Sequence, residues 1–180
     1  LPAQTAKRSA IDKKLWVMEG EESAGYRVAK TWKPSLFQGG LRKHDYYEGW
    51  YIKCVSADGK ISFALIPGIA LGGQAGDGHA FIQYIDGKTS ETHWYEFPTW
   101  EFSYSRRKFA VQIGHNYFSS DSVSVDVGSG DERLQVQLRM TDLHPWRVKA
   151  FSPGIMGWYR FVPGMETCHG LVSLDHRVDG

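Results

Sequence analysis

The sequence predicts an all-β protein: an antiparallel meander whose many short strands close into a barrel or fold into a sandwich. Three observations support this class. From Trp32 onward apolar residues recur with a period of two, which is typical of strands with one buried face. Asp-Gly pairs and other turn residues bound these runs at short intervals. Glycine accounts for 20 of 180 residues and accompanies an aromatic content of 14%, so we expect little helix.

The first 30 residues differ from the rest because they are rich in charge and poor in apolar periodicity. Basic residues between Lys7 and Lys14 are followed by glutamates between Glu19 and Glu22. This composition predicts a poorly packed N-terminal arm, with a short helix around residues 9–17 and docking to a partner as alternatives. We therefore place the β-domain at residues 31–180.

Two hairpins open the predicted meander. In the first, Tyr47–Val55 alternates, Asp58-Gly59 forms the turn, and Ile61–Ile66 is the return strand. We expect a type I′ turn, with positive φ at both central residues. The second hairpin repeats the pattern with two strands around a turn dipeptide: His79–Ile85, Asp86-Gly87 and Thr92–Phe97.

Shorter apolar runs continue the meander, and turn residues bound each of them. They are residues 109–113, 117–119, 123–127 and 134–140. Two segments with proline then interrupt it. We expect residues 141–146 to form a turn or a single helical turn, and residues 152–163 to form a loop across a barrel mouth or an irregular edge.

The last predicted strand, residues 168–178, ends at Asp179-Gly180, the same dipeptide that turns the two earlier hairpins. A strand that leads into a hairpin turn predicts a partner strand. An unpaired edge also invites aggregation. We therefore expect a second barrel or a partner chain to pair with strand 168–178.

Charge and cysteine content exclude several function classes. The chain has 21 basic and 20 acidic residues, so its net charge of +1 gives no overall reason to expect nucleic acid or an anionic membrane as partner. The basic run 106–108 is interpreted as a solvated turn.

The longest uncharged run, residues 61–76, is too short and too interrupted for a membrane helix. Cys54 and Cys168 lie far apart, which favours reduced thiols over a disulfide framework or a zinc site.

The stretch Tyr46–Tyr51 contains the strongest catalytic candidate. In a strand, Glu48 shares one face with Trp50 and two further apolar side chains. If that face points into a barrel, burial raises the pKa of Glu48 and makes it a proton donor near neutral pH. The alternative is a carboxylate at the barrel rim, satisfied by backbone amides or by Arg42 or Lys43.

Histidine and aromatic side chains supply candidate ligand contacts. His79 shares a strand face with Phe81, where it orients a ligand hydroxyl or is a hydrogen-bonded histidine at a barrel end. The histidines lack the spacing of a metal site, so we assign no metal. No GxSxG, P-loop or GxGxxG motif occurs. A further aromatic set lines an apolar ligand cavity or belongs to the core: Trp94, Tyr95, Phe97, Trp100 and Phe102.

Several of these segments together resemble the tocopherol cyclase-like family. The resemblance covers residues 32–180, and its most specific part is the aromatic-Glu-Gly-Trp-Tyr strand. The segments that carry it are Lys33-Pro34-Ser35, Phe37-Gln38-Gly39, Tyr47–Lys53, Ser152–Gly157, Phe161-Val162-Pro163 and His169-Gly170.

The resemblance implies a lipocalin-like, calycin-type antiparallel barrel, the first of two in full-length members. Plant members close the chromanol ring of tocopherols in plastids. They protonate a prenyl double bond, and the phenol oxygen then attacks the tertiary cation, with no redox cofactor. The family holds its substrate near the junction of the barrels, so we expect cyclase activity only with a second barrel present. The resemblance also implies an intracellular location, in the cytoplasm or a plastid, and it allows membrane association.

On this basis the leading hypothesis is a protein that binds a prenylated or otherwise apolar small molecule and cyclises it by acid catalysis. The alternatives are a non-catalytic lipocalin-like binding module and a structural subunit of a larger assembly. The candidate residues are Glu48 as the acid and Trp50, Tyr51, His79, Phe81 and Trp94 as substrate contacts.

Overall fold

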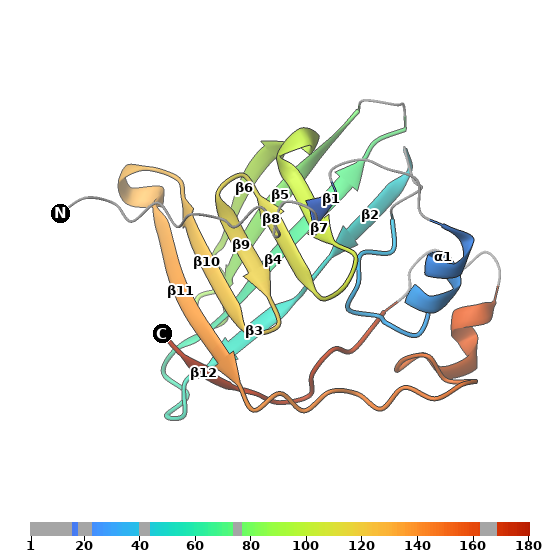
Figure 1. Cartoon of the computed structure of the whole chain (residues 1–180). Helices are drawn as coiled ribbons and strands as arrows, with labels where there is room; N and C mark the ends of the chain where they lie inside the picture. The colour runs from blue at the N-terminus through green and yellow to red at the C-terminus, as the bar shows by residue number, and fades with distance from the viewer. Residues whose placement is uncertain (1–15, 18–22, 40–43, 74–76, 163–168) are drawn as a thin grey trace.

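The computed structural model confirms an all-β, antiparallel fold (Figure 1). It describes residues 16–17, 23–39, 44–73, 77–162 and 169–180. Within these residues, no helix is both long enough and apolar enough to cross a membrane. Of the helix expected around residues 9–17, the first seven residues lie outside the described ranges, and the last two form a strand instead.

The two predicted hairpins form a five-stranded sheet. Its strands are β2 (Tyr46–Gly49), β3 (Ile52–Val55), β4 (Ser62–Leu71), β5 (Gly78–Asp86) and β6 (Thr92–Pro98). The order is β2-β4-β5-β6, and β3 also pairs with β4. Because β2 and β3 keep one register along β4, they are two halves of a single edge strand. The break lies at Trp50, whose N–H donates to the Pro67 carbonyl, because proline has no N–H to donate back.

The rest of the chain and its N-terminal part supply a seven-stranded sheet in the order β1-β7-β8-β9-β10-β11-β12. A 3-10 turn at Thr99–Glu101 joins β6 to β7 and so connects the two sheets. The strands are β1 (Trp16–Val17), β7 (Phe102–Ser105), β8 (Ala110–Ile113), β9 (Asn116–Ser119), β10 (Ser122–Val127), β11 (Leu134–Thr141) and β12 (Arg177–Asp179).

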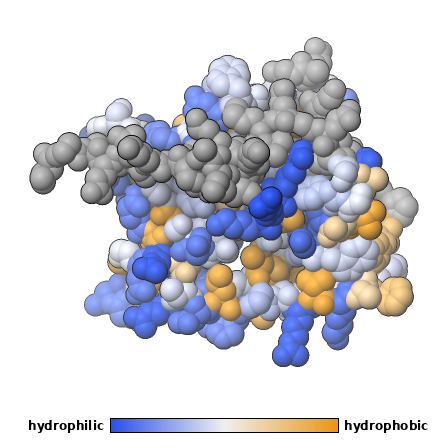
Figure 2. Space-filling model, viewed as in Figure 1, coloured by the Kyte–Doolittle hydropathy of each residue, from blue (hydrophilic) through white to orange (hydrophobic). Residues whose placement is uncertain are grey.

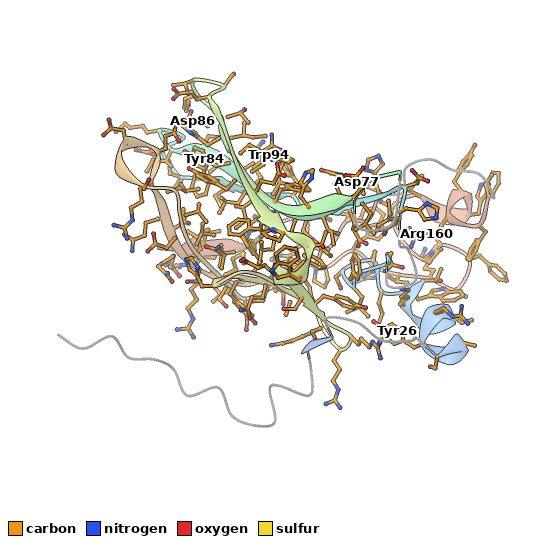
Figure 3. The ribbon with its side chains drawn as sticks, turned by 90° about the horizontal axis from the view of Figure 1, so that it is seen from above. Tyr26, Asp77, Tyr84, Asp86, Trp94 and Arg160 are labelled. Atoms are coloured by element: carbon orange, nitrogen blue, oxygen red, sulfur yellow. The ribbon has the colours of Figure 1, made fainter. Side chains whose placement is uncertain are left out.

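The two sheets face each other as layers, and the hydrophobic core lies between them (Figures 1 and 3). Leu65 and Ile82 of the first sheet and Ile113 and Phe118 of the second are fully buried there. No pairing joins β3 to β12 among the described residues, so the sheets stay open between these two strands.

Both Asp-Gly hairpins form, but neither uses the expected type I′ turn. In the first, Gly59 has a φ of +67° while Asp58 does not enter the positive region, and the Asp58 carboxylate accepts the Lys60 N–H. In the second, positive φ occurs at Ser90, and the Asp86 carboxylate accepts two amides of the loop. The aspartates therefore act as side-chain acceptors in longer turns, which removes the need for positive φ at both central residues.

The last predicted strand is much shorter than expected, because only β12 pairs with β11. Residues 169–176, which we call the crossing segment, run without regular pairing past residues 142–145. The His144 N–H donates to the Asp175 carbonyl, but the next residue is Pro145, which cannot donate, so only an isolated bridge forms there. Residue 168 lies outside the described ranges.

The helix α1 (Ala24–Lys30) begins inside the predicted N-terminal arm. The Ser23 side chain caps it by accepting the Tyr26 N–H at 3.2 Å. Its last residue, Lys30, is buried, and its ammonium group donates to the carbonyls of Phe37 and Gln38 at 3.5 and 2.9 Å. The helix thereby fixes the segment that leads into the site.

Residues 151–162 form turns and a 3-10 turn at Gly157–Phe161, which lies beside α1 in Figure 1. The Trp32 and Phe161 rings are in contact, with centroids 6.0 Å apart, and the Trp32 indole donates to the Ala150 carbonyl at 2.9 Å. The irregular segment expected here therefore packs against the residues that follow α1.

Candidate functional site

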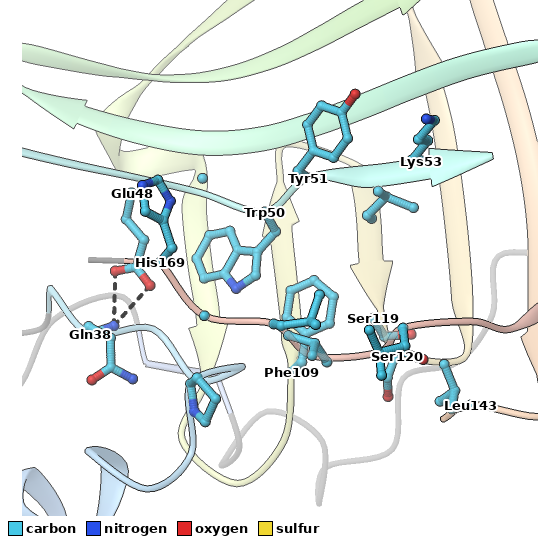
Figure 4. Close-up of a pocket in the computed structure, with 18 of the residues that line it drawn as sticks. Gln38, Glu48, Trp50, Tyr51, Lys53, Phe109, Ser119, Ser120, Leu143 and His169 are labelled. Carbon is cyan, nitrogen blue, oxygen red and sulfur yellow. Dashed lines mark hydrogen bonds between the residues drawn. The ribbon is translucent and has the colours of Figure 1, made fainter. Parts of the chain in front are cut away.

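An open cleft occupies the gap between the β2–β3 edge strand and the crossing segment (Figure 4). Its volume is about 1810 Å³, large enough for a long apolar ligand. One wall is the edge strand, and the other is the crossing segment with Met140 and Leu143. Residues after α1, including Trp32 and Gln38, close one end together with Phe161.

The inner face of the edge strand forms an apolar wall. Trp50, Ile52 and Cys54 are buried there, which confirms that they share a face as the alternation predicts. The Trp50 ring stacks on Phe109 with centroids 5.6 Å apart, and its indole N–H donates to the Ser35 carbonyl at 3.2 Å. Burial raises the pKa of the Cys54 thiol, so this wall carries no charge.

Glu48 lies at the end of this wall and is the carboxyl group next to Trp50 on the inner face. Its Oε2 accepts three hydrogen bonds: from the Tyr46 hydroxyl at 2.5 Å, the Gln38 N–H at 2.9 Å and the Gly39 N–H at 3.2 Å. Among the described residues, its Oε1 accepts a bond from the Gln38 N–H, at 3.1 Å. Oε1 therefore accepts fewer of these bonds than Oε2, and we take it as the oxygen that carries the proton.

The environment of Glu48 combines the two predicted possibilities. Burial raises the pKa of Glu48, although the bonds from Tyr46, Gln38 and Gly39 and the nearby Lys30 ammonium act in the opposite direction. Backbone amides do satisfy the carboxylate, as expected of a rim position. Arg42 and Lys43 lie outside the described residues. Glu48 is thus both a structural acceptor and a group that holds a proton more tightly than an ordinary glutamate.

Gln38 connects Glu48 to the far end of the cleft. Its side-chain amide donates to the Leu36 carbonyl at 2.7 Å, and its Oε1 accepts a bond from Arg160 at 3.1 Å. The amide group is therefore fixed on both sides. This fixes the backbone N–H that binds Glu48.

His176 is the buried polar group of the opposite wall. Both of its ring nitrogens are buried, and neither has a hydrogen-bond partner among the described residues. Its position is fixed by its neighbours, because Arg177 pairs with Thr141 and the Asp175 carbonyl accepts the His144 N–H. A buried imidazole without a partner is costly, so a ligand hydroxyl that reached these nitrogens would be bound favourably.

Four of the predicted substrate contacts lie on the other face of the five-stranded sheet. Trp50 and Tyr51 point to opposite sides of the edge strand in Figure 4, and the Tyr51 side chain is exposed. His79, Phe81 and Trp94 lie together on this outer face. The structure therefore brings Glu48 and Trp50 together in the cleft, which Tyr51 also lines, and separates them from His79, Phe81 and Trp94.

The outer face carries a row of stacked rings. Phe81 lies between Tyr47 and Trp94, with centroid distances of 5.6 and 4.4 Å and nearly parallel planes. Gly68 makes this possible, because a Cβ there would overlap the Phe81 ring. His79 contacts Phe81 and Trp94 edge-on. Phe81 is fully buried by this packing, so the row stabilises the sheet.

The other aromatic candidates belong mainly to the core. Phe102 is buried in the core, and Tyr95 and Phe97 pack against it. Trp100 is exposed on the turn between the sheets. In the part of the chain that the structure describes, no three His, Cys, Asp or Glu side chains gather as a metal site requires.

Sequence reasoning missed Tyr46, Gln38, Arg160 and His176 as parts of the site. Tyr46 follows the same alternation as Glu48, so the strand period contained the signal. The other three lie in irregular segments, where no periodicity indicates which way a side chain points. Their roles follow only from the three-dimensional contacts.

Comparisons of the chain with family models, with curated proteins and with solved structures found no match.

Proposed function

We propose that the protein binds a prenylated or otherwise apolar small molecule in the cleft and that ring closure of a prenylated phenol is its reaction. One observation carries this proposal: a carboxyl group with a raised pKa, Glu48, lies beside the buried aromatic wall of Trp50 and Phe109. The resemblance to the tocopherol cyclase-like family supports the same substrate class. For the fold, the same resemblance leads us to propose a lipocalin-like barrel, in which the gap between β3 and β12 would be closed.

The proposed reaction begins with the protonated Glu48 carboxyl group. Its proton passes from Oε1 to the prenyl double bond and leaves a tertiary cation. The phenol oxygen attacks that carbon, a C–O bond forms, and the phenol proton leaves to water. Solvent then reprotonates Glu48. The product is an isomer of the substrate, with no change in oxidation state.

The aromatic wall has a defined role in this scheme. The ring faces of Trp50 and Phe109 stabilise a developing cation electrostatically. The apolar side chains around them exclude water. Water would otherwise add to the cation and form an alcohol. His176 is a candidate hydrogen-bond partner for a ligand hydroxyl at the Leu143 end of the cleft.

The second candidate is a binding module without catalysis. The hydrogen bonds that Glu48 accepts favour it, because they stabilise the ionised form and use the carboxylate to hold residues 38–39. In this case the cleft binds the same class of ligand and releases it unchanged. A structural subunit of a larger assembly remains the third prediction.

Incubation of the protein with a prenylated hydroquinone tests the proposal. Binding is followed by tryptophan fluorescence, and an isomeric product is sought by chromatography. We expect the wild type to bind the ligand and, when a second barrel completes the site, to convert it. Glu48→Gln should bind without conversion, and the outer-face control Glu96→Gln should behave as the wild type. Binding without product in all three supports the module. Absence of binding by the wild type contradicts both candidates.

A further inference from the structure

An exposed apolar patch lies at the end of the molecule that carries α1. Figure 2 shows hydrophobic side chains gathered at this end, and the side-chain view in Figure 3 places Arg160 there as well. The side chain of Phe151 is 86% exposed and that of Trp158 is 61% exposed. We call this the docking patch, and its members are Val28, Phe151, Ile155, Trp158, Tyr159, Phe161 and Val162.

The docking patch is held in place by the fold. Phe161 contacts the Trp32 ring, and Arg160 donates to the Gln38 side chain at 3.1 Å. Trp158 and Tyr159 stack on each other, with centroids 4.2 Å apart. These contacts leave the outer parts of the apolar side chains in water, where they are costly.

The two described segments that carry the docking patch contain an excess of basic residues. Described residues 23–38 and 143–162 contain six basic residues and no acidic residue. Four of the basic side chains lie in exposed positions: Arg27, Lys33, Arg147 and Lys149. The whole chain has a net charge of only +1, so these two segments are more basic than the chain as a whole.

We infer that the docking patch binds the surface of a membrane that contains anionic lipid. Tryptophan and tyrosine favour the boundary between headgroups and acyl chains, and neighbouring lysines and arginines are attracted to anionic headgroups. Exposed aromatic tips flanked by basic side chains fit this layered surface better than the flat face of a protein partner. The patch rests on the membrane without crossing it.

The docking patch also continues into the cleft. Val28 and Phe161 belong to the patch and line the cleft as well, next to Trp32. A membrane at this end would therefore lie beside the cleft entrance. An apolar ligand dissolved in the bilayer reaches the cleft along a continuous apolar surface, with little exposure to water.

Vesicle flotation without any added ligand tests this inference separately from the proposed function. The probes are vesicles of phosphatidylcholine alone and vesicles of phosphatidylcholine with phosphatidylglycerol. We expect the wild type to bind the mixed vesicles at least about tenfold more strongly than the neutral ones. The double variant Phe151→Ser with Trp158→Ser is expected to lose about tenfold or more of its affinity for the mixed vesicles.

Two control variants distinguish binding through the docking patch from non-specific binding to vesicles. Trp100→Ser removes an equally exposed tryptophan outside the patch and is expected to bind as the wild type. Arg147→Ala with Lys149→Ala should lose the preference for anionic lipid, whereas Arg107→Ala with Lys88→Ala should keep it. Failure of the wild type to float with either vesicle overturns the inference. Equal losses for Trp100→Ser and for the patch variant overturn it too.

Discussion

The carboxylate of Glu48 accepts the backbone N–H of Gln38, whose nitrogen lies 3.1 Å from Oε1 and 2.9 Å from Oε2. This contact joins β2 to the segment that follows α1 and closes one end of the cleft. The same residue lies beside Trp50 at the end of the aromatic wall. The protonation state of one side chain is therefore coupled both to folding and to the proposed chemistry.

The first prediction concerns stability against pH in wild type and Glu48→Gln. Because burial raises the pKa of Glu48, the folded protein binds this proton more tightly than the unfolded chain does. The contribution of this proton to the free energy of unfolding is fully present below pH 4.5, the ordinary pKa of a glutamate. It is lost as the pH rises through the raised pKa of Glu48. We expect the free energy of unfolding of the wild type, relative to Glu48→Gln, to fall over this interval in urea titrations.

The control for this experiment is Glu96→Gln, which changes a carboxyl group on the outer face. The free energy of unfolding of Glu96→Gln, relative to the wild type, should stay constant over this pH interval. A difference between wild type and Glu48→Gln that grows as the pH rises would contradict the raised pKa.

The second prediction concerns the close packing of Gly68 under Phe81. A Cβ at residue 68 would overlap the Phe81 ring and approach the Glu48 carbonyl, so Gly68→Ala must displace the stacked rings. We expect a loss of about 1–3 kcal/mol in the free energy of unfolding. The control is Gly25→Ala in α1, where a Cβ meets nothing within 4 Å. It should be neutral or stabilise by up to about 1 kcal/mol. Equal effects of the two changes in urea titration would refute the packing.

Much of the fold follows from the alternation of apolar residues. Alternation fixes which side chains share a face, and so it placed Glu48 and Trp50 together on the inner wall. It does not fix how sheets pair over long distances. The short strand β7 escaped prediction because it has four residues, all buried, and precedes a basic run that was interpreted as a turn.

The candidate site was predicted less completely, for a related reason. Periodicity tells which residues of one strand share a face, but it does not tell which face of another strand meets them. His79 and Phe81 share a face, as expected, and Trp94 of the next strand lies on it too, yet the register along β4 directs that face away from the cleft. His176 lies just before β12, where Pro145 prevents regular pairing, so its burial depends on contacts that have no local signal.

The third prediction concerns His176→Phe and ligand selectivity. The change removes two buried nitrogens that lack partners among the described residues, so stability should be unchanged or higher. Wild type should bind a prenylated hydroquinone about tenfold more tightly than its dimethyl ether, because only the free hydroxyl can donate to the imidazole. The variant should bind both equally. Titration by tryptophan fluorescence measures all four affinities.

His169→Phe is the matched control, because His169 also lines the cleft but lies in an exposed position of the crossing segment. It should retain the preference for the free hydroxyl. Loss of the preference in His169→Phe, with retention in His176→Phe, would assign the hydroxyl contact to His169 instead.

The most direct test of the account is whether filling the cleft abolishes ligand binding. Val172 is half-buried on the crossing segment and lines the cleft, so Val172→Trp should occupy part of the cleft volume. Thr92→Trp adds the same side chain at an exposed position of β6. In titrations with a prenylated hydroquinone, we expect Val172→Trp to weaken binding at least about tenfold and Thr92→Trp to leave it unchanged. Unchanged binding by Val172→Trp, with the fold intact by circular dichroism, would contradict the cleft as the ligand site.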